Sequence, residues 1–559
     1  MHTTHGLNSL GSMIFASRDC FPQRPALLVP VGKEFETVTY TDFIKKIEAF
    51  AGFLVSKGLV KGDRMVILGE NCAEWHYAHY AAQSLGIVLV PIYPTLPKDQ
   101  AEYIAKDSGA KLAFVGSDEH AAKLIDVVGC TVVPLKETPN DTLDEPTWQA
   151  LRNQVDSTDL CMFIYTSGTT GLPKGAMLTH EAFLTVVHAA KEFLDFDETC
   201  VFMEFLPLSH VFEQIASTLC FFCAGCVGIN KNLASMASDF STIQPTAMAA
   251  VPRFLEAFME KVLDGVKKQK PIQQKLFHLY ISQGVKKAQG GFAPLHAPLD
   301  RIVGTKIRAR LGGRLQTVIS GGAALPKHVA EFYLALRLDI LQGYGLTETC
   351  GGSCVNHRTR NKYWTVGEPI GVELMIASDG EVLLRGPSVM KGYHNLPEET
   401  AKAIDADGWF HTGDIGEMEG ASLKITDRKK DILVLGNGKN VAPQPIENRI
   451  KESNYISEAV VLGDGMDYCV ALIMPAIDII RTELKLSEQE TIFDNKEVLA
   501  LIKKEINASN AKGAGFEMVK KWALIQEPFT IENGMLTPTL KVKRKVVKEK
   551  YADLIQSLG

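Results

Sequence analysis

The sequence predicts an α/β fold built on a mostly parallel sheet. Three short apolar runs are typical of strands: MVILG at 65–69, IVLVPI at 87–92 and LAFVG at 112–116. The segments between them have helical periodicity and contain Trp75 and Tyr103. Such alternation builds a parallel sheet covered by helices. Because ligands of such sheets bind at the carboxyl ends of the strands, we expect the functional residues on loops that follow strands.

Length and composition predict a large globular protein. The chain has 559 residues, of which 46% are hydrophobic, so more than one domain is expected. A formal net charge of −6 without long blocks of one sign does not indicate a nucleic-acid partner. No apolar stretch reaches the roughly 18 residues that a membrane span needs, and the first thirty residues do not resemble a secretory signal. Eleven scattered cysteines then indicate reduced thiols. We expect a cytoplasmic protein, at most peripheral to a membrane.

One group of cysteines admits two interpretations. Cys220, Cys223 and Cys226 match the first three ligands of a C-x2-C-x2-C iron–sulfur sequence. The fourth ligand is missing, and the flanking residues 215–229 are strongly apolar. Because free cysteine is among the most often buried residue types, we interpret this segment as a buried helix wall.

A loop rich in glycines and hydroxyls follows the apolar strand CMFI at 161–164 and precedes a helical segment that starts near Thr179. Its sequence at 165–175 is YTSGTTGLPKG. Glycines let backbone N–H groups approach an anion, hydroxyls donate further hydrogen bonds, and Lys174 adds a positive charge. The loop is not a Walker A motif, because Pro173 stands where the second glycine belongs. We interpret it as a phosphate-binding loop, since an ordinary flexible loop explains neither the hydroxyls nor the lysine.

Four further motifs follow this loop. They are SGGA at 320–323, YGLTET at 344–349, GWFHTGD at 408–414 and DRKKD at 427–431. In this order, the five motifs resemble the adenylate-forming superfamily, which includes acyl-CoA synthetases, luciferases and peptide-synthetase adenylation domains. The resemblance spans nearly the whole chain. It implies a large multi-sheet N-terminal domain with parallel β-α-β layers at 1–427, a hinge at 428–430 and a small, mobile α+β C-terminal domain at 431–559.

The resemblance assigns two groups of residues to the nucleotide. Those of the glycine-rich loop would bind the ATP phosphates: Thr166, Ser167, Gly168, Thr169, Thr170 and Lys174. Those of the later motifs would bind the rest of ATP or AMP: Gly321, Gly322, Ala323, Gln342, Gly343, Tyr344, Asp414 and Arg428. A tyrosine can stack on adenine, and an aspartate can accept both ribose hydroxyls. Taken alone, Tyr344 and Asp414 are more typical of structural turns.

The motifs also suggest a metal site and a hinge. Glu348 offers the hard oxygen that Mg²⁺ prefers, and Thr347 can donate to an α-phosphate oxygen. The resemblance adds Thr170 beside the metal and makes Lys430 the hinge residue about which the C-terminal domain rotates between two half-reactions. Without the resemblance, Glu348 is consistent with a solvated loop acid and 427–431 with a solvated charged turn.

The closing segment GMLTPTLKVKR at 534–544 resembles the superfamily's last motif, in which Lys541 would be the catalytic lysine beside Glu348 and Thr347. Leu540 stands where the superfamily commonly has a glycine. A second interpretation takes the basic residues of 541–550 as a solvated helix face, and we favour it for every lysine after Lys541.

Residues on the substrate side rest on resemblance alone. His210, Val211 and Phe212 match the superfamily's substrate-side helix and would line an acyl pocket, although His210 is equally consistent with a structural histidine. Gly436, Gly438, Lys439 and Asn440 would face CoA, and an ordinary β-turn accounts for them equally well.

The sequence therefore predicts a ligase that activates a long-chain fatty acid with ATP and Mg²⁺ and passes the acyl group to CoA. The segments 275–277, 298–315 and 438–443 resemble the long-chain branch. Transfer to an acyl carrier protein, a luciferase-type oxygenase and a catalytically silent nucleotide-binding paralogue are the alternatives. Chain-length preference, oligomeric state and membrane docking stay open.

Overall fold

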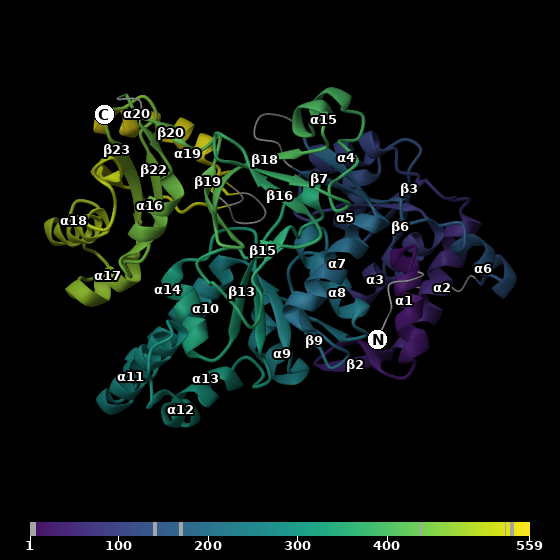
Figure 1. Cartoon of the computed structure of the whole chain (residues 1–559), viewed down its shortest axis with the longest axis horizontal. Coiled ribbons are helices and arrows are strands. Elements are labelled where there is room, and N and C mark those ends of the chain that lie inside the picture. The colour runs from purple at the N-terminus through teal and green to yellow at the C-terminus, as the bar shows by residue number, and fades with distance from the viewer. Residues whose placement is uncertain (1–6, 138–141, 167–171, 437–438, 531–532, 537–541) are drawn as a thin grey trace. The chain divides into compact units, whose positions relative to one another are not determined.

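A computed structural model describes residues 7–137, 142–166, 172–436, 439–530, 533–536 and 542–559 (Figure 1). The chain divides into two compact units. The first unit comprises 1–375, 383–412 and 419–423, and the second comprises 376–382, 413–418 and 424–559. The predicted α/β class is confirmed, and so is its division into a large multi-sheet part and a smaller C-terminal part.

The first unit contains two large sheets. The nine-stranded sheet has the order β15-β14-β13-β12-β11-β9-β10-β1-β2 and is parallel from β1 through β13. Its strands are β1 (Pro25–Val31), β2 (Glu34–Thr39), β9 (Val201–Glu204), β10 (Cys226–Ile229), β11 (Ala247–Ala250), β12 (Thr317–Ser320), β13 (Asp339–Tyr344), β14 (Cys354–Val355) and β15 (Glu368–Pro369). Strands β2, β14 and β15 pair with their neighbours in the antiparallel sense.

The six-stranded sheet confirms the predicted strand–helix alternation. Its order is β6-β5-β3-β4-β7-β8, and only the pairing of β7 with β8 is antiparallel among the described residues. Its strands are β3 (Arg64–Leu68), β4 (Val88–Ile92), β5 (Leu112–Val115), β6 (Thr131–Pro134), β7 (Leu160–Thr166) and β8 (Lys174–Thr179). Strand β4 is buried along its whole length, as expected for a parallel strand covered on both faces.

The helices of the first unit cover and join these sheets. They are α1 (Leu10–Cys20), α2 (Tyr40–Ser56), α3 (Ala73–Leu85), α4 (Lys98–Ser108), α5 (Asp118–Leu124), α6 (Glu145–Arg152), α7 (His180–Leu194), α8 (Val211–Phe222), η1 (Leu233–Ser235), α9 (Met236–Ile243), α10 (Pro252–Lys267), α11 (Pro271–Ala288), α12 (His296–Leu299), η2 (Asp300–Gly304), α13 (Thr305–Ala309), α14 (Lys327–Ala335), η3 (Thr347–Thr349) and α15 (Pro397–Ala403).

A four-stranded sheet of order β16-β17-β18-β19 follows in the chain: β16 (Glu373–Ile376), β17 (Glu381–Arg385), β18 (Phe410–Glu419) and β19 (Ser422–Arg428).

Helices α2, α3 and α8 form a shared layer between the two large sheets. Phe221 of α8 is fully buried, and its ring centroid lies 5.4 Å from that of Phe43 in α2 and 5.6 Å from that of Tyr80 in α3. Two turns farther along α2, Phe50 lies 5.6 Å from Phe114 of β5. Aromatic contacts of this kind dominate the energetics of a core. The layer therefore ties the nine-stranded sheet to the six-stranded one.

A buried polar group crosses the same layer. The Nε2 atom of His76 in α3 lies 3.0 Å from Glu204 Oε2 at the end of β9, and Ser217 Oγ in α8 donates to the same oxygen at 2.9 Å. All three residues are almost completely buried. Buried polar groups that are paired in this way specify one packing arrangement, because any shift leaves a buried polar atom without a partner.

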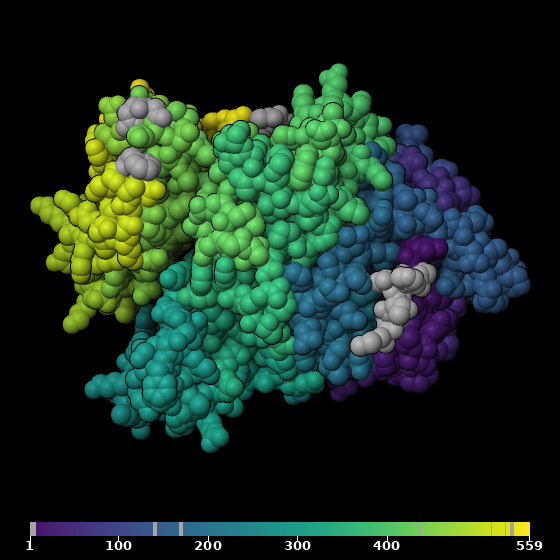
Figure 2. Space-filling model, viewed as in Figure 1, coloured from purple at the N-terminus to yellow at the C-terminus, as the bar shows by residue number. Residues whose placement is uncertain are grey.

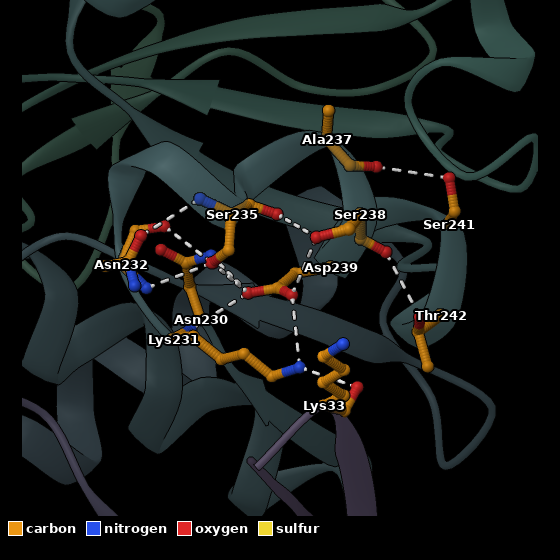
Figure 3. A network of polar contacts seen from close by, with 10 residues as sticks. All are labelled: Lys33, Asn230, Lys231, Asn232, Ser235, Ala237, Ser238, Asp239, Ser241 and Thr242. Carbon is orange, nitrogen blue, oxygen red and sulfur yellow. Dashed lines mark hydrogen bonds and ion pairs between the residues drawn. The ribbon is translucent and has the colours of Figure 1, made fainter. Parts of the chain in front are cut away.

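Asp239 fixes the connection between β10 and α9. Its fully buried carboxylate accepts hydrogen bonds from Asn230 Nδ2 at 2.8 Å, the backbone N–H of Lys231 at 2.9 Å and Ser235 Oγ at 2.8 Å. Figure 3 shows this carboxylate at the centre of the network, with the Lys231 side chain reaching the backbone of Lys33. The network thus fastens the β1–β2 hairpin to the sheet.

The second unit is a small α+β fold. Its three-stranded sheet contains β22 (Ile456–Leu462), β23 (Cys469–Pro475) and β24 (Val519–Leu524), and a short hairpin contains β20 (Leu433–Val434) and β21 (Asn440–Val441). Its helices are α16 (Pro443–Ile450), α17 (Ile477–Leu484), α18 (Lys496–Asn510), η4 (Gly515–Glu517), α19 (Arg544–Lys550) and α20 (Ala552–Leu558). Among the helices that the structure describes, none combines the length and the apolar character that crossing a bilayer requires.

His180, the first residue of α7, is buried in the neutral form. Its Nδ1 accepts a hydrogen bond from the backbone N–H of Leu10 at 3.2 Å, and its Nε2 has no partner among the described residues. Burial lowers the pKa of His180 to about 4. Since the unfolded imidazole titrates near 6.5, the unfolded chain binds the extra proton first as the pH falls.

We therefore expect His180 to contribute stability that is complete above about pH 6.5 and is lost as the pH falls toward about 4, by up to roughly 3 kcal/mol. His180→Asn keeps a hydrogen-bond acceptor near Nδ1 but has no group that titrates in this window. The Tm of the wild type should exceed that of the variant at neutral pH, and the gap should close on acidification. A gap that is constant with pH would contradict the assignment.

Candidate functional site

The glycine-rich loop joins β7 to β8. Thr166, the last residue of β7, pairs with Lys174, the first residue of β8, so the two ends of the loop lie side by side. The predicted phosphate-binding residues Ser167, Gly168, Thr169 and Thr170 lie outside the described residues. The predicted context is confirmed, because the loop follows a strand and precedes α7, whose N-cap is Thr179.

The segment 390–394 runs beside β8. The backbone N–H of Met177 donates to Gly392 O at 3.0 Å, and that of His394 donates to Gly175 O at 2.8 Å. This pairing places the ring of Tyr393 5.2 Å from Lys174 Nζ, a cation–π distance. Lys174 also forms an ion pair with Glu399 of α15, which lowers the pKa of that carboxyl to about 2. The loop lysine is thus held beside an aromatic ring and a carboxylate.

Tyr393 links this lysine to Glu348. Its phenol donates to Glu348 Oε1 at 2.8 Å, and the backbone N–H of Met390 donates to the Glu348 carbonyl at 2.8 Å. Burial, with Glu348 next, raises the pKa of Tyr393 far above its ordinary value, so the phenol stays a donor. No described residue donates to Glu348 Oε2. One oxygen of the half-buried carboxylate is therefore oriented and the other is available to a ligand.

Sequence reasoning missed Tyr393 and Glu399. Neither belongs to a motif with a chemical signature, and 393 lies 45 residues from Glu348 in the chain. Only the pairing of 390–394 with β8 brings these side chains to the loop.

The turn after β12 approaches α8 closely. A Cβ atom on Gly321 would lie 2.8 Å from the ring of Phe212, so a larger residue there would need that ring to shift. Gly322 has a φ of +84°, a left-handed conformation that glycine adopts without strain. Gly322 and Ala323 are exposed, and so are available to a ligand. Thus the predicted acyl-pocket residue Phe212 and the predicted nucleotide residue Gly321 are in contact.

The end of β13 carries the next group of predicted residues. Both side-chain groups of Gln342 are engaged with the backbone, because Nε2 donates to Tyr363 O at 2.7 Å and Oε1 accepts from Leu325 N at 3.0 Å. Gln342 thereby holds the turn after β12 against β13. Gly343, Tyr344 and Thr347 are partly exposed beyond it, at the carboxyl end of the strand where ligands of parallel sheets bind.

His210 caps α8. Its Nδ1 accepts a hydrogen bond from the backbone N–H of Phe212 at 3.0 Å, in the manner of an N-cap side chain. Val211 is buried and contacts Gly351, where an added Cβ would lie 3.1 Å away. The structural interpretation of His210 is therefore confirmed, whatever further role its ring has.

Two carboxylates are buried beside this cap. Glu213 Oε1 accepts from the backbone N–H of Phe205 at 3.0 Å and so fixes the segment that leads into α8. Burial, reinforced by the neighbouring charge of Glu204, raises the pKa of Glu213 well above its usual range. Both carboxyl groups are shielded from solvent, and their role is to position the start of α8.

In the second unit, Asp414 and Arg428 form an ion pair across β18 and β19. Arg428 Nε donates to Asp414 Oδ1 at 2.8 Å, and the aspartate is buried while the arginine is partly exposed. Lys429, which follows, pairs with Asp379 at 2.7 Å and with Glu381 at 2.9 Å. Lys430 is exposed in the turn after β19. The two predicted nucleotide residues are thus adjacent, next to the predicted hinge residue.

Three of the predicted CoA-side residues, Gly436, Lys439 and Asn440, lie at the β20–β21 hairpin. The backbone N–H of Leu435 donates to Lys439 O at 2.9 Å, and that of Gly436 donates to Met466 O at 2.7 Å. Lys439 and Asn440 are exposed, and Gly438 lies outside the described residues. The described residues on either side of 437–438 pair as a hairpin, and both the turn and a role toward CoA stay predictions.

The basic segment at the C-terminus separates into two kinds of residue. Lys541 lies outside the described residues, and Lys543, Lys545, Lys548 and Lys550 are exposed, as the solvated-face interpretation predicts. Arg544 instead points inward. Its NH1 donates to Glu447 at 2.6 Å and to Val461 O at 2.7 Å. Arg544 is thus a structural residue that anchors α19, a role that the charge pattern did not reveal.

The cysteine segment is buried, as predicted. Cys220, Cys223 and Cys226 are at most 7% exposed, and burial raises the pKa of Cys223 and of Cys226 to about 12. Thiols with such values are protonated and pack as small apolar side chains. Among the described residues, no group of three or more His, Cys, Asp or Glu is arranged to hold a metal ion.

Comparisons with known proteins agree with this geometry. The model of a family described as AMP-binding enzyme matches residues 15–394, and that of an AMP-binding enzyme C-terminal domain matches 430–558. The chain is 34% identical to the long-chain-fatty-acid–CoA ligase FadD15 of Mycobacterium tuberculosis over 93% of this chain and 92% of the relative. It is 31% identical to long chain acyl-CoA synthetase 2 of Arabidopsis thaliana over 93% and 87% of the two chains.

Solved structures share the fold. ATP-bound MatB from Rhodopseudomonas palustris superposes with a TM-score of 0.73 at 22% identity, covering 98% of this chain and 100% of the other. A Mycobacterium tuberculosis fatty acyl CoA synthetase does so with a TM-score of 0.62 at 24% identity, covering 98% and 99%.

Proposed function

Because the chain belongs to the AMP-binding enzyme family, we propose that it is a long-chain-fatty-acid–CoA ligase that uses ATP and releases AMP and pyrophosphate. The observation that carries this proposal is the end-to-end match at 34% identity to a relative named for that activity. The arrangement of Lys174, Tyr393 and Glu348 at the carboxyl ends of β7 and β13 supports it, since it offers a cation and a carboxylate to a nucleotide phosphate.

In the proposed first half-reaction, a carboxylate oxygen of the fatty acid attacks the α-phosphorus of ATP. The bond from that phosphorus to the bridging oxygen breaks, and pyrophosphate leaves with the electron pair. Lys174 and the loop 166–170 would hold the departing phosphates, while Thr347 and Lys541 would neutralise charge at the α-phosphate. Catalysis then comes from positioning and charge neutralisation, and no side chain forms a covalent intermediate.

In the proposed second half-reaction, the thiolate sulfur of CoA attacks the acyl carbonyl of the adenylate. The bond from the carbonyl carbon to the phosphate oxygen breaks, and AMP leaves with the electron pair. Residues around the β20–β21 turn, including Lys439, would face CoA. The AMP-binding C-terminal domain model begins at 430, which supports a domain boundary at the proposed hinge 428–430.

Further residues described above have proposed roles toward the nucleotide. In the first unit, Tyr344 would stack on adenine beside the open turn of Gly322 and Ala323. In the second unit, Asp414 would accept the ribose hydroxyls and Arg428 would contact the nucleotide. The wall that Phe212 forms against Gly321 would bring the fatty carboxylate next to the α-phosphate.

Glu348 fits a role in binding Mg²⁺. It presents one hard oxygen, Oε2, without a partner among the described residues, while Tyr393 holds the other. With Thr170 it would hold the ion, which when bound offsets the negative charge of the ATP phosphates. Tyr393 is then a positioning residue, acting through Glu348.

Tyr393→Phe should therefore raise the Mg²⁺ concentration needed for half-maximal pyrophosphate release by roughly threefold to tenfold, because it removes the hydrogen bond that orients Glu348. Tyr333→Phe is the matched control. It removes a buried hydrogen bond of 2.9 Å from the Tyr333 phenol on α14 to the Leu255 carbonyl on α10. The control should lower Tm without moving the Mg²⁺ dependence. An unchanged Mg²⁺ requirement in Tyr393→Phe would remove this role.

Lys541→Ala should abolish adenylate formation from fatty acid and ATP while largely sparing thioester formation from a preformed acyl-adenylate, because its charge is needed only while the α-phosphate is attacked. Single-turnover assays of each half-reaction measure the two steps separately. Lys543→Ala, an exposed neighbour, is the control and should leave both intact. Equal loss of both steps in Lys541→Ala would refute its assignment.

Pyrophosphate release from ATP and Mg²⁺ with carboxylates from acetate to oleate, with and without CoA, tests the proposed function. We expect release that requires a long chain and is stimulated by CoA. Release that ignores CoA but responds to an acyl carrier protein would identify the carrier as the acceptor, and no release with any carboxylate would favour a silent paralogue. No disulfide joins any of the eleven cysteines in the described part of the chain, which supports a reducing, cytoplasmic setting for this reaction.

A further inference from the structure

Glu399 of α15 forms an ion pair with the lysine to which the proposed function assigns the departing phosphates. Its Oε2 contacts Lys174 Nζ, and its Oε1 lies 2.6 Å from Lys402 Nζ. The carboxylate therefore lies between two ammonium groups, one at the end of the glycine-rich loop and one on its own helix. Hydrogen bonds from Lys174 and Lys402 lower the pKa of Glu399 to about 2, so the carboxylate keeps its charge at every physiological pH.

Helix α15 is fastened to the segment that carries Tyr393. The backbone N–H of Tyr393 donates to Thr400 Oγ1 at 2.8 Å, and the same hydroxyl donates to Leu396 O at 2.9 Å. A Cβ atom on Gly392 would lie 2.7 Å from Thr400 Cγ2, so helix and segment are in close contact. Because the segment itself pairs with β8, Glu399 is held at a fixed place beside the first residue of that strand.

Stability of the fold does not explain this ion pair. The side chains of Lys174 and Glu399 are 30% and 32% exposed, and ion pairs so accessible to water contribute little to folding. Lys402 would still neutralise Glu399 if Lys174 were withdrawn, so no charge would be left without a partner. Figure 1 shows α15 near the top of the view, and Figure 2 shows the surface of this segment there, in green.

We propose that Glu399 is a displaceable internal anion: its carboxylate pairs with Lys174 until a phosphate group of ATP replaces it, and it returns when pyrophosphate leaves. This inference rests on the proposed function and adds a positioning residue to it. The ring of Tyr393, 5.2 Å from Lys174 Nζ, would hold the lysine in place while one anion replaces the other. Glu399 would keep its contact with Lys402 throughout.

Such an exchange weakens binding and favours release. A phosphate that reaches Lys174 must displace a carboxylate, and the two anions repel each other if both remain near the ammonium group. Pyrophosphate therefore binds less tightly than it would to the lysine without Glu399. When pyrophosphate departs, the returning carboxylate restores an opposite charge to Lys174, which makes its departure easier.

Calorimetric titration of the full chain with pyrophosphate and Mg²⁺ tests the proposal. Glu399→Gln should bind pyrophosphate about twofold to fivefold more tightly than wild type, because the amide has no charge with which to compete for Lys174. A contact that only supported the fold would have the opposite effect, since its loss would loosen the site and weaken binding. Unchanged or weaker binding in Glu399→Gln would overturn the proposal.

Two controls locate the effect. Glu398→Gln removes an equal charge from the same turn of α15, but among the described residues Lys174 pairs with Glu399 and not with Glu398, so this variant should bind pyrophosphate as wild type does. AMP has no β- or γ-phosphate, so its affinity should be the same in Glu399→Gln and wild type. An equal gain in Glu398→Gln, or an equal gain for AMP, would refute displacement at Lys174.

A double-mutant cycle tests whether Glu399 acts through the lysine. In a Lys174→Ala background, Glu399→Gln should no longer raise the affinity for pyrophosphate, because the ammonium group that both anions share is gone. The gain in the wild-type background should also shrink when ionic strength rises from about 0.1 M to about 0.5 M, since salt screens exposed charges. A gain that persists without Lys174 would contradict the exchange.

These measurements separate the inference from the ligase proposal. Wild type that binds pyrophosphate but forms no acyl-CoA would contradict the ligase proposal alone. Wild type that binds pyrophosphate as tightly as Glu399→Gln does would contradict the role of Glu399 alone, and wild type that binds neither ATP nor pyrophosphate would refute both. An unchanged Tm in each variant would show that the differences in affinity do not come from unfolding.

Discussion

The shared helical layer between the two large sheets is the constraint on which the rest of the first unit depends. Phe221 of α8 contacts α2 and α3 at once, and the His76–Glu204–Ser217 group crosses the same boundary. Each sheet needs this layer to bury one face, since a sheet exposed on both sides has no core. Loops that follow β7, β12 and β13 are therefore held in register, although they belong to different sheets.

The same layer explains why the substrate-side and nucleotide-side candidates adjoin. Helix α8 begins with Val211 and Phe212, which fill the space left by Gly351 and Gly321. A side chain at either glycine would need Phe212 or Val211 to shift, so the glycines of these motifs serve close packing as well as any approach of a ligand. Changes in α8 should therefore be felt in the turns after β12 and β13.

Opposite charges are arranged differently in the two units. In the first, Tyr393 lies between Lys174 and Glu348, and Lys174 also pairs with Glu399, so these charged groups are only partly buried. In the second, Arg544 donates hydrogen bonds to Glu447 and to the Val461 carbonyl. Loss of Glu447 would leave the buried guanidinium without an opposite charge. Basic residues of one sequence segment can thus have opposite duties, and burial decides which.

The sequence by itself determined the α/β class, the strands at 65–69, 87–92 and 112–116, the position of the glycine-rich loop after a strand, and the family. These follow from local periodicity and from motifs whose residues are contiguous. Tertiary structure alone decided that Tyr393 orients Glu348, that Gln342 is tied to the backbone on both sides, that His210 is a helix cap and that Arg544 is buried. Tyr393, Gln342 and Arg544 depend on partners distant in the chain, and local composition carries no signature of such a partner. The His210 cap is local, with a partner two residues away, but histidine is not one of the residue types that typically cap helices.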